Sequence, residues 1–338
     1  MFLKRASWIS LVALALLVCR GIGAQDRVRL GLSSISATSG SIWIAEEKGL
    51  FKKQGVNVEV IFIGGGASRV VSALLSGEIQ FSVGGGDAVI RAALRGADTV
   101  LTASPMSRGL QRLIVRPDIK TPAELKGKRV SITRFGSAGH WAFQLFVRKW
   151  GMHPEDFQLI QLDSSPAMFA SLEKDGCDAA VLTMPSFFVA EEKGFRTLAD
   201  PADMDIYYLQ NSIDSTRSYL RANRTQAVRF VKGVIEGIAY FKKYRKESLD
   251  VLQKKLRIQS SQEKNVRYLE ASYNLLATKY YNQIPYANPK AIETSLQFVA
   301  AEDPKAKGVD TKLFVDDSIV REIEASGFIK QLYDTEYR

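Results

Sequence analysis

The chain has 338 residues, 46% of them hydrophobic, and a formal net charge of +10 from 46 basic and 36 acidic residues. This length and apolar content suffice for two domains with their own cores. Basic residues are scattered, and we interpret the one dense patch, residues 242–246, as the solvated end of a helix. We therefore expect no nucleic-acid partner.

Residues 1–24 have the pattern of a secretory signal peptide. Lys4 and Arg5 precede an apolar stretch, Trp8 to Val18, and the small residues Gly23 and Ala24 follow. The stretch is shorter than the roughly 20 residues of a bilayer span, so we expect cleavage near Ala24 and an exported product. Lipidation at Cys19 is the alternative, although Val18 is an unusual residue before a lipidated cysteine.

Cys19 would leave with the signal peptide. Cys177 would then be the only thiol, so no intramolecular disulfide is expected.

The region from Val28 to Ala103 alternates strand and helix patterns, which predicts a parallel-rich sheet covered by helices on both faces. The predicted strands are 28–32, 56–63, 79–83 and 99–103, and the predicted helices are 41–48, 67–76 and 87–95.

A further apolar strand, Leu110 to Val115, leads to Pro117 and Pro122, where we expect the chain to cross into a second lobe. The second lobe repeats the alternation, with strands 129–133, 158–162, 179–182 and 196–198 and helices 137–150, 166–174 and 185–192. Tyr207 to Gln210 is a candidate return crossing. The remaining helices, 225–244, 246–256, 262–278, 289–302 and 316–326, are expected to wrap the first lobe.

This organisation predicts an α/β protein of two doubly wound lobes joined by a two-segment hinge. We assign residues 25–117 and 212–338 to lobe 1 and residues 118–211 to lobe 2. Two crossings permit bending while restricting twist, which is the geometry of ligand-clamping proteins.

The pentapeptide AEEKG occurs twice, at Ala45 to Gly49 and at Ala190 to Gly194. In each copy a helix meets a glycine, which tolerates the left-handed conformation that closes a helix, and a strand follows. The repetition suggests two similar lobes, although α/β proteins in general end helices in this way.

Small residues gather in five loops that follow predicted strands. In doubly wound sheets, ligands bind beyond the carboxyl ends of the strands, where helix N-termini favour anionic or polar groups. The alternative is that these residues only turn the chain or cap helices. The loops are residues 33–38, 64–68, 84–87, 134–139 and 183–185.

Several side chains in these loops, or on the helix turn that follows one of them, have a possible ligand role and a structural alternative. Asp87 could accept hydrogen bonds from a ligand, but capping its helix is the simpler role. Arg134 could pair with a carboxylate or sulfonate, or lie exposed. Trp141, next to His140, could form an aromatic wall, although packing is the default for both.

The sequence offers little for catalysis. The two histidines, His140 and His153, have no metal-ligand spacing, and no GxSxG, GxGxxG or GxxxxGK[ST] motif is present. Cys177 is most simply a small buried hydrophobe. We expect no cofactor, no metal and no catalytic residues.

Three segments resemble the substrate-binding proteins of ABC importers for nitrate, sulfonates, taurine and thiamine precursors, which are type II periplasmic binding proteins. The segments are Ile44 to Phe51 with Gly55 to Val60, Ala73 to Ile79, and Pro122 to Val130. The first motif is fairly specific to this group, and the resemblance extends over essentially the whole mature chain.

The resemblance implies two lobes that close on one small molecule. By position it assigns the binding role to the loops after the first three strands and to the second-lobe helix that begins near Ser137. With Arg134 added from its position after a strand, the predicted ligand-binding residues are Ser34, Ser36, Gly66, Ala67, Gly86, Asp87, Arg134, Gly136, Ser137, Ala138 and Met184. The first loop lacks an obvious aromatic clamp, which argues against a pyrimidine ligand.

The expected function is that of a monomeric periplasmic or secreted protein that delivers a small, anionic or zwitterionic organic solute to an inner-membrane permease with a cytoplasmic ATPase. Two alternatives remain. One is an enzyme on the same fold, like the relatives that make thiamine or menaquinone precursors, although the cysteine- and histidine-rich constellation of the thiamine-precursor synthases is missing. The other is an exported sensor module.

Overall fold

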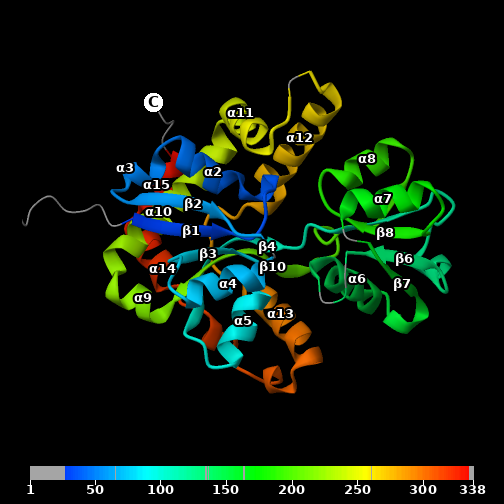
Figure 1. The fold of residues 1–338 in the computed structure, drawn as a ribbon, viewed down its shortest axis with the longest axis horizontal. Coiled ribbons are helices and arrows are strands. Elements are labelled where there is room, and N and C mark those ends of the chain that lie inside the picture. The colour runs from blue at the N-terminus through cyan, green and yellow to red at the C-terminus, as the bar shows by residue number, and fades with distance from the viewer. Residues whose placement is uncertain are drawn as a thin grey trace, which may run out of the picture.

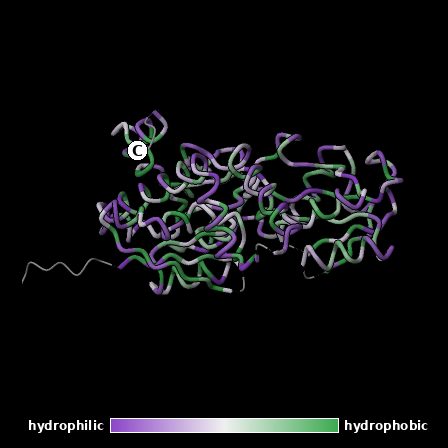
Figure 2. Tube along the Cα trace, turned by 90° about the horizontal axis from the view of Figure 1, so that it is seen from above, coloured by the Kyte–Doolittle hydropathy of each residue, from purple (hydrophilic) through white to green (hydrophobic). Residues whose placement is uncertain are grey.

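The computed structural model describes residues 27–334, apart from residues 65, 134, 136, 163 and 260. The predicted signal peptide, the lipidation site at Cys19, Arg134 and Gly136 lie outside the described residues. Figure 1 shows two lobes side by side, each built on its own sheet. Figure 2, seen from above, shows hydrophobic segments running through both lobes.

The first lobe has a five-stranded sheet in the order β2-β1-β3-β10-β4. β1 pairs in parallel with β2 and β3, whereas β10 is antiparallel to β3 and β4. The bounds are β1 Arg27–Leu32, β2 Asn57–Phe62, β3 Phe81–Gly84, β4 Thr99–Arg108 and β10 Tyr207–Thr216.

The second lobe repeats this arrangement in the order β7-β6-β8-β5-β9. β6 is parallel to β7 and β8, and β5 is antiparallel to β8 and β9. The bounds are β5 Arg112–Val115, β6 Arg129–Ile132, β7 Gln158–Gln161, β8 Ala179–Leu182 and β9 Arg196–Ala199. The two sheets thus have equivalent topologies, as the AEEKG repeat suggested.

Helices cover both faces of each sheet. In lobe 1, α2 and α10 pack on one face, and α4, α5 and α13 pack on the other. In lobe 2, α6 covers one face, and α7 and α8 cover the other. The helices are α2 Gly40–Glu47, α3 Leu50–Lys53, α4 Ala67–Leu75, α5 Asp87–Leu94, α6 Ala138–Lys149, α7 Ser165–Glu173, α8 Ser186–Glu192, α9 Arg217–Ala222, α10 Arg224–Lys243, α11 Arg245–Leu256, α12 Glu263–Leu275, α13 Pro289–Glu302, α14 Ser318–Ala325 and α15 Phe328–Asp334.

The chain crosses between the sheets twice, once from β4 to β5 and once from β9 to β10. The predicted two-lobe fold with a C-terminal helical region on lobe 1 is therefore confirmed. Two details of the predicted lobe boundaries differ. β5, placed in lobe 1, pairs with β8 and β9 in the second sheet, and Tyr207 to Asn211, placed in lobe 2, already belong to β10 in the first sheet. An apolar run indicates a buried strand but does not indicate which sheet it joins.

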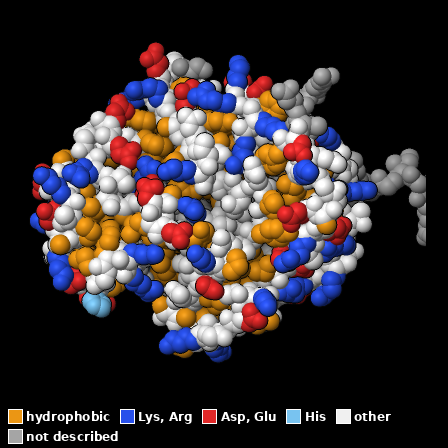
Figure 3. Space-filling view, turned by 180° about the vertical axis from the view of Figure 1, so that it is seen from behind, with side chains coloured by type: hydrophobic (Ala, Val, Ile, Leu, Met, Phe, Trp, Pro, Cys, Tyr) orange, Lys and Arg blue, Asp and Glu red, His pale blue; other side chains and the backbone are white. Residues whose placement is uncertain are grey.

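The basic patch at residues 242–246 is engaged with neighbouring groups. Lys242 donates to the carbonyl oxygen of Ala277 at 2.8 Å, Arg245 lies 3.3 Å from Glu270, and Lys246 lies 2.9 Å from Asp250. On the face shown in Figure 3, basic and acidic side chains are interspersed rather than segregated. Within the described residues, no helix is both long and apolar enough to cross a membrane.

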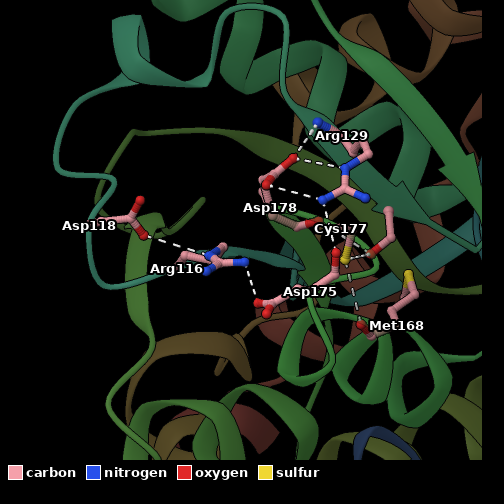
Figure 4. Close-up of polar contacts among 9 residues, drawn as sticks. Arg116, Asp118, Arg129, Met168, Asp175, Cys177 and Asp178 are labelled. Carbon is pink, nitrogen blue, oxygen red and sulfur yellow. Dashed lines mark hydrogen bonds and ion pairs between the residues drawn. The ribbon is translucent and has the colours of Figure 1, made fainter.

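An ionic cluster lies at the amino ends of β6 and β8. Arg129 contacts Asp178 at 3.1 Å through Nε, and Arg116 pairs with Asp175 (Figure 4). Between them, the fully buried Cys177 lies 3.5 Å from the hydroxyl of Ser131. This cluster is at the opposite end of β6 and β8 from the loops predicted to bind ligand, and Cys177 is confirmed as a buried core residue.

A buried carboxyl lies in the centre of the first sheet. Asp214 of β10 is 1% exposed and accepts a hydrogen bond from Ser82 of β3 at 3.1 Å, while its Oδ1 has no partner among the described residues. Burial raises the pKa of Asp214 to about 8, and the nearby Asp87 adds to that shift. The folded protein thus keeps this carboxyl protonated at neutral pH.

We predict that Asp214→Asn changes how the free energy of unfolding depends on pH. Because the pKa of Asp214 is raised on folding, its contribution is fully present below the unfolded value near 3.8 and declines until the pH reaches about 8. Between these limits, the free energy of unfolding of the asparagine variant should increase relative to that of the wild type by up to about 1.4 kcal/mol per pH unit. Urea unfolding at pH 5 and pH 8 measures this, and a difference independent of pH would contradict the assignment.

Candidate functional site

The loops that follow β1, β2 and β3 meet at the carboxyl edge of the first sheet. The N–H of Ser33, directly after β1, donates to the carbonyl oxygen of Val83 in β3 at 3.0 Å. A Cβ placed on Gly84 would lie 3.0 Å from Cβ of Ala67 and 3.2 Å from Oγ of Ser33. The structure therefore brings together three segments that the sequence predicted to share a site.

The loop after β1 has one exposed and one engaged serine. Ser34 is exposed, whereas Ser36 is half-buried and caps a short 3-10 helix, Ala37–Ser39. The Ser36 hydroxyl accepts from the N–H of Thr38 at 3.3 Å and lies 2.5 Å from its hydroxyl. Two side chains from outside the loop hold it in place, because Asn211 and Tyr281 both donate hydrogen bonds to the carbonyl oxygen of Thr38.

Gly66 and Ala67 begin α4. Gly66 is exposed and has φ +81°, a conformation that L side chains rarely adopt, and no atom lies within 4 Å of a Cβ placed there. The first N–H groups of a helix lack partners within the helix, and α4 has nine residues. This helix start is therefore open to a polar group above the sheet edge.

Gly86 packs against β10, which assigns it a structural role. Its N–H donates to the carbonyl oxygen of Leu209 at 3.1 Å, and a Cβ at Gly86 would lie 2.8 Å from Cβ of Leu209. The residue is buried. The lack of a side chain here serves a close approach between the α5 start and β10.

Asp87 is bonded to a tyrosine and does not cap α5. Its Oδ1 accepts a hydrogen bond from the hydroxyl of Tyr208 at 3.0 Å, and its Oδ2 lies 3.8 Å from Nε of Arg91. Burial raises the pKa of Tyr208 well above 10, with Asp87 adding to the shift. The capping prediction was wrong, because Gly86 occupies the cap position and the carboxylate turns toward β10.

In lobe 2, α6 begins as predicted. Ser137 caps the helix by accepting from the N–H of His140 at 3.3 Å, and it also accepts from the hydroxyl of Thr133 at 2.8 Å. Ala138 is the first helical residue and is half-buried. Arg134 and Gly136, predicted for the same loop, are outside the described residues.

Trp141 lies at the contact between the lobes. Its ring stacks on Phe298 of α13, with centroids 4.5 Å apart, and Tyr208 completes the cluster. Trp141 is 3% exposed and Phe298 is fully buried. Packing, the default expectation for Trp141, is confirmed, although its partner belongs to the other lobe.

Met184 also bridges the lobes. It packs against the main core of lobe 1 and against the α7–α8 core of lobe 2, as does Leu275 of α12. Of the predicted residues, the following thus lie on segments at the facing ends of the sheets or at the contact: Ser34, Ser36, Gly66, Ala67, Ser137, Ala138 and Met184.

Sequence reasoning missed the apolar side chains around these loops. Five large hydrophobic residues are exposed in the described part of the chain, and three of them, Ile35, Phe62 and Phe135, follow or end a strand at the candidate site. Their position within or beside loops of small residues was a readable signal. Across residues 27–334 with their five gaps, no group of three or more His, Cys, Asp or Glu side chains is placed to hold a metal.

Comparison with known proteins gives a family. The family model described as NMT1/THI5 like matches residues 37–248, more than half of the chain. A Brucella abortus protein named as a binding protein is 27% identical over 262 residues, covering 76% of this chain and 80% of the relative. The Bacillus subtilis protein YtlA, also named as a binding protein, is 26% identical over 227 residues, covering 65% of this chain and 67% of YtlA.

Solved structures show the same fold. The periplasmic aliphatic sulphonate binding protein SsuA from Escherichia coli aligns with a TM-score of 0.70 at 21% identity, covering 86% of this chain and 92% of SsuA. The periplasmic nitrate-binding protein NrtA from Synechocystis aligns with a TM-score of 0.65 at 13% identity, covering 91% of each chain. The chain therefore belongs to the NMT1/THI5-like family and has the fold of the periplasmic substrate-binding proteins of ABC importers.

Proposed function

We propose that the protein is an exported, monomeric, non-catalytic binding protein that captures a small anionic or zwitterionic organic solute between its lobes. It delivers this solute to a permease in the inner membrane that works with a cytoplasmic ATPase. The observation that carries the proposal is the meeting of the Ser33, Ala67 and Gly84 segments at the edge of the first sheet. The family supports it, since its binding-protein relatives cover most of the chain.

The proposed polar site joins backbone groups from both lobes. The start of α4 in lobe 1 and the start of α6 in lobe 2 each present N–H groups and a partial positive charge. A ligand that contacts both starts binds the closed arrangement better than the open one, which is the condition for ligand-driven closure. The residues that we propose to line the ligand site are Ser34, Ser36, Gly66, Ala67, Ser137, Ala138 and Met184, with Arg134 and Gly136 added from the sequence alone.

The two AEEKG copies place glutamates against consecutive helices. In the first copy, Glu47 of α2 lies 2.7 Å from Lys254 of α11, within lobe 1. In the second copy, Glu192 of α8 accepts a hydrogen bond from Tyr268 of α12 and lies 3.3 Å from Arg267. Because α12 packs on lobe 1 and α8 belongs to lobe 2, the Glu192 contacts link the lobes (Figure 1).

We predict that Glu192→Gln shifts the ligand-free protein toward an open arrangement. Exposed ion pairs are weak, so the open-to-closed ratio should rise by no more than about fivefold. Small-angle X-ray scattering would show a larger radius of gyration. The hydrogen bond from Tyr268 lowers the pKa of Glu192, so its contacts persist above pH 4.5 and are lost as the pH falls through the lowered value.

Glu47→Gln is the matched control, because it removes the equivalent pair inside lobe 1 and should leave the scattering unchanged. An equal change in both variants, or in neither, would show that the Glu192 contacts do not set the distance between the lobes.

We predict that Ser137→Trp abolishes ligand-induced thermal stabilisation, because an indole at the α6 start blocks the approach of a ligand. For a tight ligand at 100 times its dissociation constant, the stabilisation at stake is about 2.7 kcal/mol. Thr216→Trp is the control. Thr216 is also a half-buried helix cap, and its hydroxyl accepts a hydrogen bond from the N–H of Tyr219 at 3.2 Å. It lies at the edge of the first sheet opposite to the small-residue loops.

The assay begins with mass spectrometry of the solute that co-purifies with the protein, followed by thermal-shift screening with sulfonates, carboxylates, nitrate and pyrimidines. Undiminished stabilisation of Ser137→Trp would remove the α6 start from the site. Turnover of the bound solute by the purified protein would instead favour the enzyme alternative.

A further inference from the structure

A pocket of about 150 Å³ opens beside the loop that follows β1. It lies between the carboxyl ends of β1 and β2, helix α2 and helix α11. Its apolar walls are Leu32, Ile35, Trp43, Val60 and Phe62. Leu32 and Phe62 are register partners in the sheet, so their side chains lie next to each other on the face covered by α2.

The pocket has a buried floor and an exposed apolar rim. Leu32 and Trp43 are 2% and 4% exposed, whereas Ile35 and Phe62 are 55% and 52% exposed. Leaving two large hydrophobic side chains in water forgoes the favourable free energy of burying their apolar surface. An apolar group in the pocket would recover part of that free energy.

An ion pair forms the polar wall of the pocket. Nζ of Lys255 lies 2.6 Å from Glu46 and 3.3 Å from Glu47, so this cation already has two carboxylate partners. Both Lys255 and Glu46 line the pocket. Glu47 also pairs with Lys254 at 2.7 Å, so two cations face two carboxylates and the wall has no net charge. The pocket therefore favours an uncharged group.

The pocket shares its loops with the proposed polar site. Ile35 lies between Ser34 and Ser36, and Phe62 ends the strand that leads to Gly66. A ligand whose charged group sits at these loops can therefore extend its remaining part over Ile35 and Phe62. A volume of about 150 Å³ is large enough for a benzene-sized group.

We propose that the ligand is amphipathic, with an anionic head at the converging loops and an apolar body, a ring or a chain of about six carbons, seated between Trp43, Ile35 and Phe62. This inference rests on the proposed function and narrows its ligand class. The other possible occupant is Phe135 of lobe 2, 55% exposed, but its ring packs edge-on against His140 of its own lobe, with centroids 5.2 Å apart.

The test is a binding series of linear sulfonates with one, four, six and eight carbons, together with carboxylates of the same chain lengths, measured by calorimetry on the whole protein. Affinity should rise about fourfold per methylene and level off near six carbons. In the double variant Ile35→Ser, Phe62→Ser the rise, measured as the ratio of hexanesulfonate to methanesulfonate affinity, should fall below about twofold per methylene.

The double variant Leu75→Ser, Leu313→Ser is the matched control. It removes two other exposed hydrophobic side chains, from the end of α4 and from the 3-10 helix Thr311–Phe314, and should keep the fourfold rise. Equal affinity for short and long chains, or an unchanged rise in the Ile35–Phe62 variant, would overturn the inference while leaving anion binding intact. Weaker binding of hexanesulfonate by the single variant Phe135→Ala would overturn the inference as well, because it would indicate that the Phe135 ring occupies the pocket.

Neutral 1-hexanol separates this inference from the function on which it rests. Binding of 1-hexanol that is lost in the Ile35–Phe62 variant, with no anion bound at any length, would support the pocket and contradict the anionic ligand. If neither 1-hexanol nor any of the anions binds, the result would contradict both the apolar pocket and the proposed function.

Discussion

The arrangement of the molecule depends on the antiparallel pairing of β4 and β10. Their register runs from Thr99 opposite Thr216 to Arg108 opposite Tyr207, so the outgoing and returning chains leave the first sheet side by side. Each then continues within a few residues into the second sheet, through β5 and from β9. Two short neighbouring connections allow the lobes to bend toward each other and limit sliding or twisting.

The pairing also orients the two sets of loops. The carboxyl ends of the parallel strands in each lobe carry the small-residue loops, while the amino ends of β6 and β8 carry the Arg129–Asp178 cluster and the buried Cys177. Polar groups that stabilise the fold and groups available to a ligand are thus separated to opposite edges. In the first lobe the available edge combines backbone N–H groups at the α4 start with an apolar pocket beneath Ile35 and Phe62. This combination suits a ligand with two chemically different ends.

Much of the fold could be predicted from sequence periodicity. Ala179 to Leu182 and Pro289 to Glu302 have the predicted bounds, and most other predicted elements differ by one or two residues at their ends. β4 was predicted too short because it continues past Ala103 into residues 104–108, which still belong to the strand. The candidate return crossing, Tyr207 to Gln210, forms the first part of β10. β5 was placed in the wrong sheet, since burial alone does not identify a partner strand.

The candidate site was less predictable, because its contacts join residues far apart in sequence. Asp87 has the sequence pattern of a helix cap, but its carboxylate accepts a hydrogen bond from Tyr208, 121 positions away. Gly86 has the pattern of a ligand-binding glycine, but Leu209 fills the space beside it. The partner of Trp141, Phe298, comes from the other lobe. Ser137, whose capping contact is local, was predictable for that reason.

The central claim is that the two lobes close over a shared solute. Spin labels on Lys52 in lobe 1 and Glu155 in lobe 2, both exposed, with Cys177 replaced by Ala, would report the distance between the lobes by double electron–electron resonance. Protein that has been freed of its co-purifying solute by unfolding and refolding should give a broad distribution of distances between the spin labels. Adding the solute back should shift this distribution to a single shorter distance. Identical distributions with and without the solute would contradict the account.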